Sequence, residues 1–204
     1  MPISKKHNCI FIHIPKTAGT SIEASLGMHG DLDYIGIKPY TSQIKNQDTL
    51  FGAGLQHLTA LQVKRKIKNY DDYYKFTFVR NPWSRFVSAM IFNGSLRRNL
   101  KLNLTKSEFK KKMQDINYSA CYFKCQLDYI KHDGNLLVDF IGRFENLHED
   151  YSHISSVLGV NLTLERRMET NHKHYTEYYD DETRQIVAEK YAKDIEYFGY
   201  KFGE

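Results

Sequence analysis

The first structural unit that the sequence predicts begins with CIFIHIPKTAGTS at residues 9–21. Its apolar run, residues 9–14, favours a short buried strand that ends at Pro15. A helical pattern follows over residues 20–26 and has a hydroxyl side chain at its start. The small residues in between allow backbone amides to face a ligand near the positive end of the helix. This stretch therefore predicts a strand, an anion-binding loop and a helix.

The same order of strand, turn and helix recurs twice along the chain. Residues 73–79 predict a buried strand closed by Asn81 and Pro82, after which a helix runs to residue 92. Residues 136–141 form a third β-prone run, followed by a helical stretch over residues 146–158. Strands that alternate with helices indicate a mainly parallel sheet with helices on its faces, and ligands bind at the carboxyl ends of such strands.

Local patterns predict the remaining elements. Thr59 with Gln62 and Thr105 with Glu108 fit the capping box, in which two side chains satisfy free amides at a helix start. The other predicted segments are a short strand around residues 34–37, helices that end near 69 and 116, and a helix over residues 120–130. A final helix is predicted over residues 181–197, ended by Gly199, with one apolar face made by Ile186, Val187, Tyr191 and Ile195.

Length and composition bound the class of protein. A chain of 204 residues favours one domain, residues 1–204, and the content of 41% apolar and 26% charged residues is typical of a globular protein. The net charge of +5 favours an anionic ligand or polymer. No apolar run has the length of a signal sequence or a membrane span, so we expect a soluble, cytoplasmic protein. Three cysteines without a CxxC pair predict neither disulfides nor zinc.

The loop at residues 15–21 differs from the ATP-binding Walker A loop. That motif places its lysine after the second glycine, whereas Lys16 precedes Gly19. The order Pro-Lys-Thr-Ala-Gly-Thr-Ser instead resembles the 5′-phosphosulfate loop of sulfotransferases that use 3′-phosphoadenosine 5′-phosphosulfate (PAPS), particularly the carbohydrate sulfotransferases and their bacterial relatives. The resemblance implies a loop that holds the 5′-phosphosulfate through Lys16, Thr17, Ala18, Gly19, Thr20 and Ser21. The alternative is an ordinary turn with a surface lysine.

A second phosphate-binding motif follows the second predicted strand. Arg80 lies at the strand end and Ser88 on the helix after it, so both can converge on one phosphate. This spacing resembles the 3′-phosphate motif of the same family, in which an arginine and a serine hold the 3′-phosphate. Arg85 is a further cation of this helix that can equally be a solvated or salt-bridged surface residue. Arg143, after the third strand, matches a family segment that helps to hold the nucleotide.

Sulfuryl transfer needs a base for the acceptor hydroxyl and a positive charge at the leaving phosphate oxygen. Lys16 is the natural partner for that oxygen. Histidine is the usual base near neutral pH, and His57 lies between the two phosphate motifs, where carbohydrate members of the family have their catalytic histidine. A histidine that serves only the nearby helix start is the alternative, and Glu23 is the reserve base.

We predict no metal site. The leaving group is already a stable phosphate, and His172 and His174 lack a third ligand at a recognisable spacing. The segment at residues 171–175 resembles instead the loop that closes over the donor in bacterial members of the family.

Together these features predict a P-loop-like, three-layer α/β domain with a mainly parallel central sheet flanked by helices. The resemblance implies a PAPS-dependent sulfotransferase that releases adenosine 3′,5′-bisphosphate and sulfates a hydroxyl, expected on a carbohydrate. We expect neither nucleic acid nor a membrane as a partner. Two other functions remain open, a nucleotide kinase with a magnesium site and a non-catalytic module that binds anions or glycans.

Overall fold

The computed structural model of the protein describes residues 3–28, 55–95, 104–164 and 173–204. The chain divides into two compact units. The first comprises Met1–Val79 and Asp128–Met168, and the second comprises Arg80–Leu127 and Glu169–Glu204. The strand predicted around residues 34–37 lies outside the described residues. Within the described ranges, no helix combines the length and apolar character needed to cross a membrane.

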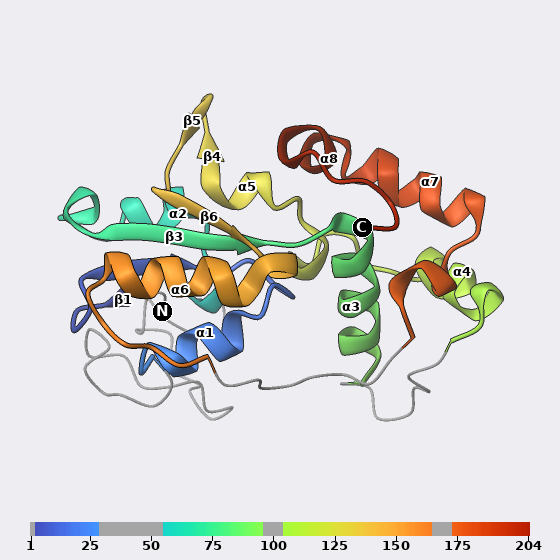
Figure 1. The fold of residues 1–204 in the computed structure, drawn as a ribbon. Coiled ribbons are helices and arrows are strands. Elements are labelled where there is room, and N and C mark those ends of the chain that lie inside the picture. The colour runs from blue at the N-terminus through green and yellow to red at the C-terminus, as the bar shows by residue number, and fades with distance from the viewer. Residues whose placement is uncertain (1–2, 29–54, 96–103, 165–172) are drawn as a thin grey trace. The chain divides into compact units, whose positions relative to one another are not determined.

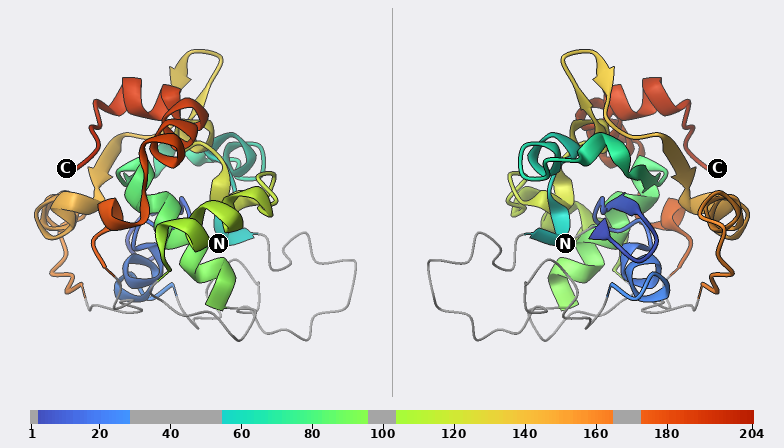
Figure 2. Two further views of the ribbon diagram at one scale, coloured as in Figure 1. Left: turned by 90° about the vertical axis from the view of Figure 1, so that its right-hand side faces the viewer. Right: turned by 90° about the vertical axis from the view of Figure 1, so that its left-hand side faces the viewer.

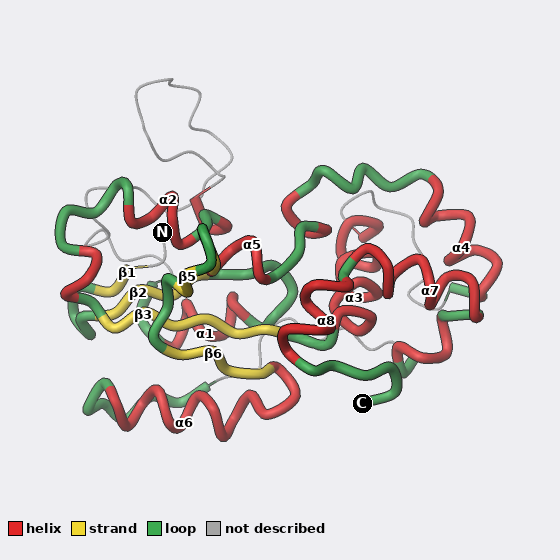
Figure 3. The backbone as a smooth tube through the Cα atoms, turned by 90° about the horizontal axis from the view of Figure 1, so that it is seen from above, coloured by secondary structure: helices red, strands yellow, loops and turns green. Residues whose placement is uncertain are grey.

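A four-stranded sheet forms the centre of the first unit. Its strands are β1 (Ile3–Ser4), β2 (Cys9–Ile12), β3 (Tyr74–Val79) and β6 (Phe140–Arg143), which lie side by side in the order β1-β2-β3-β6 (Figure 3). The pairs β2–β3 and β3–β6 are parallel, and β1 is an antiparallel edge strand. The carboxyl ends of β2, β3 and β6 therefore lie at one edge of the sheet. The prediction of a mainly parallel sheet is confirmed.

Helices flank this sheet, also as predicted. Helices α1 (Gly19–Ser25) and α6 (Leu147–Val157) lie on the same side of it (Figure 1), where Ile22 and Ile154 pack against Phe11 and Phe76. The close packing extends into β6, because a Cβ on Gly142 would lie 2.5 Å from the Phe78 ring. The unit also contains the α-helix α2 (Ala60–Lys64) and short 3₁₀ helices, which carry the symbol η: η1 (Leu55–His57), η2 (Tyr70–Asp72) and η4 (Phe144–Asn146). The hairpin of β4 (Lys131–His132) and β5 (Asn135–Leu136) projects away from the sheet (Figure 2).

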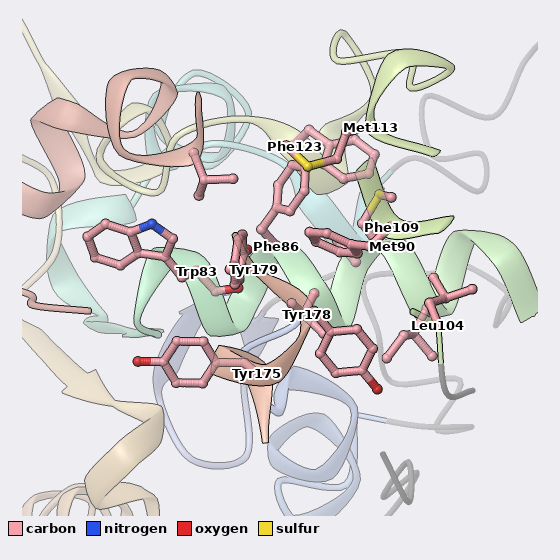
Figure 4. Close-up of a cluster of buried hydrophobic side chains, with 14 of the residues drawn as sticks. Trp83, Phe86, Met90, Leu104, Phe109, Met113, Phe123, Tyr175, Tyr178 and Tyr179 are labelled. Carbon is pink, nitrogen blue, oxygen red and sulfur yellow. The ribbon is translucent and has the colours of Figure 1, made fainter. Parts of the chain in front are cut away.

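The second unit is helical with an aromatic core. Phe86 on α3 (Pro82–Ser95) contacts the rings of Phe109, Phe123 and Tyr191. Figure 4 shows this cluster, in which Trp83, Tyr175 and Tyr179 also take part. The other helices are α4 (Lys106–Gln114), η3 (Cys121–Phe123), η5 (Tyr175–Tyr178), α7 (Asp181–Lys190) and α8 (Ala192–Phe198).

Both predicted capping boxes are confirmed. The hydroxyl of Thr59 accepts from the amide of Gln62, and the hydroxyl of Thr105 accepts from the amide of Glu108. In each box a side-chain oxygen of the second residue accepts a hydrogen bond from the amide of the threonine. The helices are shorter than predicted, because α2 ends at Lys64 and α4 ends at Gln114.

The prediction of a single helix over residues 120–130 is wrong. The segment forms the short helices η3 and α5 (Leu127–Ile130), separated by extended backbone at Lys124. Two of its main-chain amides, those of Gln126 and Leu127, donate hydrogen bonds to the carboxylate of Asp194, which is distant in the sequence. These hydrogen bonds replace the ones that a continuous helix would have made.

Two other predicted elements are divided. The β-prone run at residues 136–141 is split between β5 and β6, and Asp139 between them binds the main chain of Lys75. The final helix breaks at Tyr191 into α7 and α8, and Ile186 on the predicted apolar face is 40% exposed. Gly199 ends α8 with left-handed backbone, as predicted.

Candidate active site

The predicted anion-binding loop, residues 15–21, follows the carboxyl end of β2, and we call it the Lys16 loop. Lys16 and Ala18 have left-handed backbone, with φ of 70° and 66°, which is uncommon outside glycine and occurs in anion-binding turns. The hydroxyl of buried Thr17 donates to the main-chain oxygen of Ile14 at 2.8 Å and closes the turn. Lys16, Ala18 and Thr20 are partly exposed. The loop is thus buried and hydrogen-bonded at Thr17, while Lys16, Ala18 and Thr20 are accessible to solvent.

Gly19 is the residue at which this loop meets the core. It begins α1, and a Cβ added there would lie 2.0 Å from Nε2 of His13. The imidazole of His13 is buried and is tied through its other nitrogen. Glycine is therefore required here by the close approach of the His13 ring.

Four polar residues form a hydrogen-bonded group beside the loop, which we call the histidine cluster: His13, Glu23, Gln56 and His57. His13 Nδ1 lies 2.9 Å from Oε1 of Glu23, and Gln56 Nε2 donates to Oε2 of Glu23 at 2.7 Å. His57 Nδ1 lies 3.1 Å from the main-chain oxygen of His13. The two imidazole rings meet edge to face, with centroids 4.6 Å apart.

This geometry defines the protonation of His57. A carbonyl oxygen can only accept, so neutral His57 carries its proton on Nδ1 and keeps a lone pair on Nε2. Burial lowers the pKa of His57 to about 4, and the charges of His13 and Lys16 act in the same direction. The hydrogen bond to the His13 carbonyl and the charge of Glu23 oppose this shift. At pH 7 His57 is therefore neutral, the form in which a base accepts a proton.

The same geometry bears on Glu23, the reserve base. Its side chain is only 5% exposed, and both of its carboxylate oxygens have partners within the cluster. A general base must come within hydrogen-bonding reach of the proton that it removes. His57 is partly exposed and meets this requirement better than Glu23.

Arg143 is the last residue of β6 and lies opposite Val79 in the register of the parallel pair. Its amide donates to Oδ2 of Asp150 at 2.6 Å, which ties the strand end to α6. The structure thus places partly exposed Arg143 at the same sheet edge from which the Lys16 loop departs.

Arg80 and Ser88 belong to the second unit, together with Ser84. Arg80 Nε donates to Oγ of Ser84 at 3.0 Å. The side chain of Gln126 holds the main chain of Arg80 by two hydrogen bonds, each of 2.8 Å. Ser84 and Ser88 are four residues apart on α3, so they share one face of this helix. The Arg80 side chain is thereby directed along the face that carries Ser88.

The structure gives Arg85 neither of the surface roles considered from the sequence. Its side chain is 1% exposed, and its guanidinium donates to the main-chain oxygens of Tyr122 and Lys124. The guanidinium carbon also lies 5.3 Å from the ring centroid of Tyr191. Arg85 therefore holds the segment around η3 in place.

We expect Arg85→Met to destabilise the protein by about 2–4 kcal/mol, because two main-chain carbonyls lose the charged donors of a buried guanidinium. Urea unfolding measures this change. The control is Arg184→Met, which removes an arginine that is 49% exposed. Equal destabilisation in the two variants would contradict a structural role that is particular to Arg85.

Sequence reasoning missed three residues of these arrangements: His13, Gln56 and Ser84. His13 continues the apolar run of β2, and such a position normally holds another apolar residue. The presence of a histidine in an apolar strand was the signal in the sequence that could have identified His13 as a site residue. Gln56 and Ser84 are ordinary polar residues in the sequence, so only their contacts in the structure identify them as site residues. Of the segment at residues 171–175, His172 lies outside the described residues, and His174 Nδ1 lies 2.7 Å from Oγ1 of Thr176.

A mainly parallel sheet flanked by helices defines the class of this protein as an α/β fold. The profile of the Sulfotransferase family matches residues 1–201. The chain belongs to the sulfotransferase family, which makes it a transferase of sulfuryl groups. It is also 34% identical, over 103 residues, to an uncharacterized protein of Archaeoglobus fulgidus; the alignment covers 50% of this chain and 82% of that protein. No solved structure gives a significant match.

Proposed function

We propose that the protein transfers a sulfuryl group from PAPS to an acceptor hydroxyl, with His57 as the base. The observation that carries this proposal is the position of His57 in the first unit. Its ring lies against His13, whose imidazole in turn lies against Gly19 of the Lys16 loop. A base next to an anion-binding loop is the arrangement that sulfuryl transfer requires.

The Lys16 loop suits the 5′-phosphosulfate end of PAPS. Its left-handed residues Lys16 and Ala18 favour close approach of backbone amides to an anion. The ammonium group of Lys16 adds the positive charge that a departing phosphate oxygen needs. Thr17, Thr20 and Ser21 complete the proposed loop.

Arg80 and Ser88 suit the 3′-phosphate. Arginine holds phosphate through parallel hydrogen bonds, and the contact of Arg80 with Ser84 keeps the guanidinium on the α3 face of Ser88. We propose Ser84 as a further hydroxyl for this phosphate and Arg143 as a contact to the nucleotide. Because the family match spans both units, we also propose that residues 1–204 act as one P-loop-like domain.

The reaction balances without a further reactant. The acceptor oxygen forms a bond to sulfur while the bond between sulfur and the phosphate oxygen breaks, and its electrons remain on the phosphate. Adenosine 3′,5′-bisphosphate leaves, and Nε2 of His57 takes the proton of the hydroxyl. Positioning and electrostatic stabilisation supply most of the acceleration, as they do in phosphoryl transfer.

The acceptor that we propose is a carbohydrate. This proposal rests on the resemblance of the loop to that of carbohydrate sulfotransferases. Aromatic side chains suit sugar faces, and the sequence contains 15 tyrosines and 12 phenylalanines. They suit a phenolic acceptor equally well, so the experiment includes both classes.

The test compares ligands by thermal shift and then measures transfer. We expect adenosine 3′,5′-bisphosphate to raise the melting temperature without magnesium, and ATP with magnesium to have a smaller effect. Radiolabelled PAPS is then offered with a panel of oligosaccharides and phenols. Stabilisation by ATP and magnesium alone would overturn the proposal in favour of a nucleotide kinase. Binding of anionic glycans without transfer would favour a non-catalytic module.

Arg80→Ala should weaken the affinity for adenosine 3′,5′-bisphosphate by about 10- to 100-fold, the value of a lost charge-assisted contact of about 1.5–3 kcal/mol. Calorimetric titration measures the dissociation constant. Arg65→Ala is the control, because Arg65 is exposed and lies outside the proposed site. An unchanged affinity in Arg80→Ala would remove Arg80 from the donor site.

A further inference from the structure

The histidine cluster contains a carboxylate, that of Glu23, to which the proposed reaction assigns no role. Glu23 lies on α1 with 5% of its side chain exposed. Moving a carboxylate from water into such a place is costly unless it is paired and hydrogen-bonded. Both conditions are met, because Oε1 faces Nδ1 of His13 and Oε2 accepts from Gln56. The buried charge thus joins two segments that are distant in the sequence.

Each oxygen of Glu23 leads to His57 by a separate path. The first path runs through His13, whose main-chain oxygen faces Nδ1 of His57. The second runs through Gln56, which precedes His57 in the three-residue helix η1. One carboxylate therefore secures both the imidazole of His57 and the backbone that carries it.

We propose that Glu23 is the positioning residue of the site: by holding His13 and Gln56, it keeps His57 protonated on Nδ1 and its Nε2 lone pair available to the acceptor hydroxyl. This inference rests on the proposed role of His57 as the base. Glu23 touches none of the reacting atoms and does not itself take the proton.

The charges around His57 support this assignment. Among the residues that the structure describes, three charged or titratable groups act on its imidazole: His13 and Lys16 lower the pKa of His57, and Glu23 raises it. When His57 takes the proton of the acceptor, it becomes a cation next to these groups. Glu23 therefore contributes the one negative charge among the three, and it stabilises the imidazolium that forms during transfer.

Two variants separate charge from geometry. Glu23→Gln is isosteric and keeps an acceptor for His13, and rotation of the Gln56 amide restores the second hydrogen bond, so chiefly the charge is lost. Gln56→Leu leaves the pair of His13 and Glu23 intact and removes only the hydrogen bond that anchors η1. The matched controls are Glu196→Gln and Gln114→Leu, which alter exposed side chains of the second unit.

The first measurement is the tautomer of His57, read by long-range ¹H–¹⁵N NMR at pH 7 and assigned with His57→Ala. The wild-type protein should show a proton on Nδ1. Gln56→Leu should show a mixture of the two tautomers, and its kcat should fall at least about tenfold, while its affinity for adenosine 3′,5′-bisphosphate stays unchanged. Glu23→Gln should keep the tautomer and lose kcat, because only the charge that stabilises the imidazolium is gone.

A wild-type proton on Nε2 of His57 would overturn the inference, as would wild-type kcat in both variants. These results differ from a failure of the proposed function. If the protein does not use PAPS, or if His57→Ala retains full turnover, the assignment of His57 as the base fails. The tautomer and its dependence on Gln56 are measured without any turnover, so they still report whether Glu23 positions the ring.

Discussion

Replacing His57 with alanine is expected to lower kcat by about a hundred- to ten-thousand-fold, the range that a general base contributes. The affinity for adenosine 3′,5′-bisphosphate should remain, because the proposed phosphate contacts come from other residues. Initial rates at saturating PAPS measure kcat, and calorimetry measures the affinity. His148→Ala is the matched control, since His148 is an exposed histidine on α6. An equal loss of turnover and of donor affinity would contradict the assignment of His57 as the base.

The pH dependence of the wild-type enzyme provides a second test of the role of His57 as the base. A base must be deprotonated, so activity rises with pH through its pKa and then levels off. For His57 in the free protein the rise in kcat/KM is expected near pH 4, in place of the value near 6.5 of an ordinary histidine. A bound anionic donor stabilises the imidazolium and should move the rise in kcat to higher pH. The rise should be absent in His57→Ala, and its persistence there would assign it to another group.

Lys16→Met is expected to lower kcat by about a hundred- to a thousand-fold, as the loss of a group that stabilises developing negative charge does. Both side chains have a Cβ, so the left-handed backbone at this position is strained to a similar degree in the two proteins. The effect can therefore be attributed to the ammonium group. Donor affinity should also fall, by less than kcat, because the charge on the leaving oxygen grows during transfer.

Single-turnover rates with labelled PAPS measure the chemical step in this variant. Lys68→Met, at an exposed position between α2 and η2, is the control. Lys16→Arg adds a test of geometry, because it keeps the charge and changes its shape and reach. A normal single-turnover rate in Lys16→Met would exclude Lys16 from the transition state and leave the loop as a binding element only.

The elements that could be predicted from the sequence are those whose hydrogen bonds are local. Strand β3 agrees with its apolar run to within one residue, and the helices after Thr59 and Thr105 begin where their capping boxes place them. Each of these signals lies within a few neighbouring residues. The parallel sheet followed from them, because strands joined through helices pair in parallel.

The elements that were predicted wrongly are those that distant residues interrupt. The helix expected over residues 120–130 is replaced by two short helices, since Asp194 and the guanidinium of Arg85 bind its amides and carbonyls. The break between α7 and α8 falls at Tyr191, whose hydroxyl donates to the main-chain oxygen of Phe123. No periodicity in either segment reveals partners so far away in the chain.

The candidate site likewise has features that could be predicted from the sequence and features that only the tertiary structure decides. The order of residues 15–21, and the spacing of Arg80 and Ser88, are properties of the chain itself, so the family and the proposed phosphate contacts could be read without coordinates. The protonation of His57 could not, because it depends on a carbonyl 44 residues earlier in the chain and on the burial of Glu23. Hydrogen bonding and desolvation act through space, and only folding brings His13, Glu23 and Gln56 around that ring.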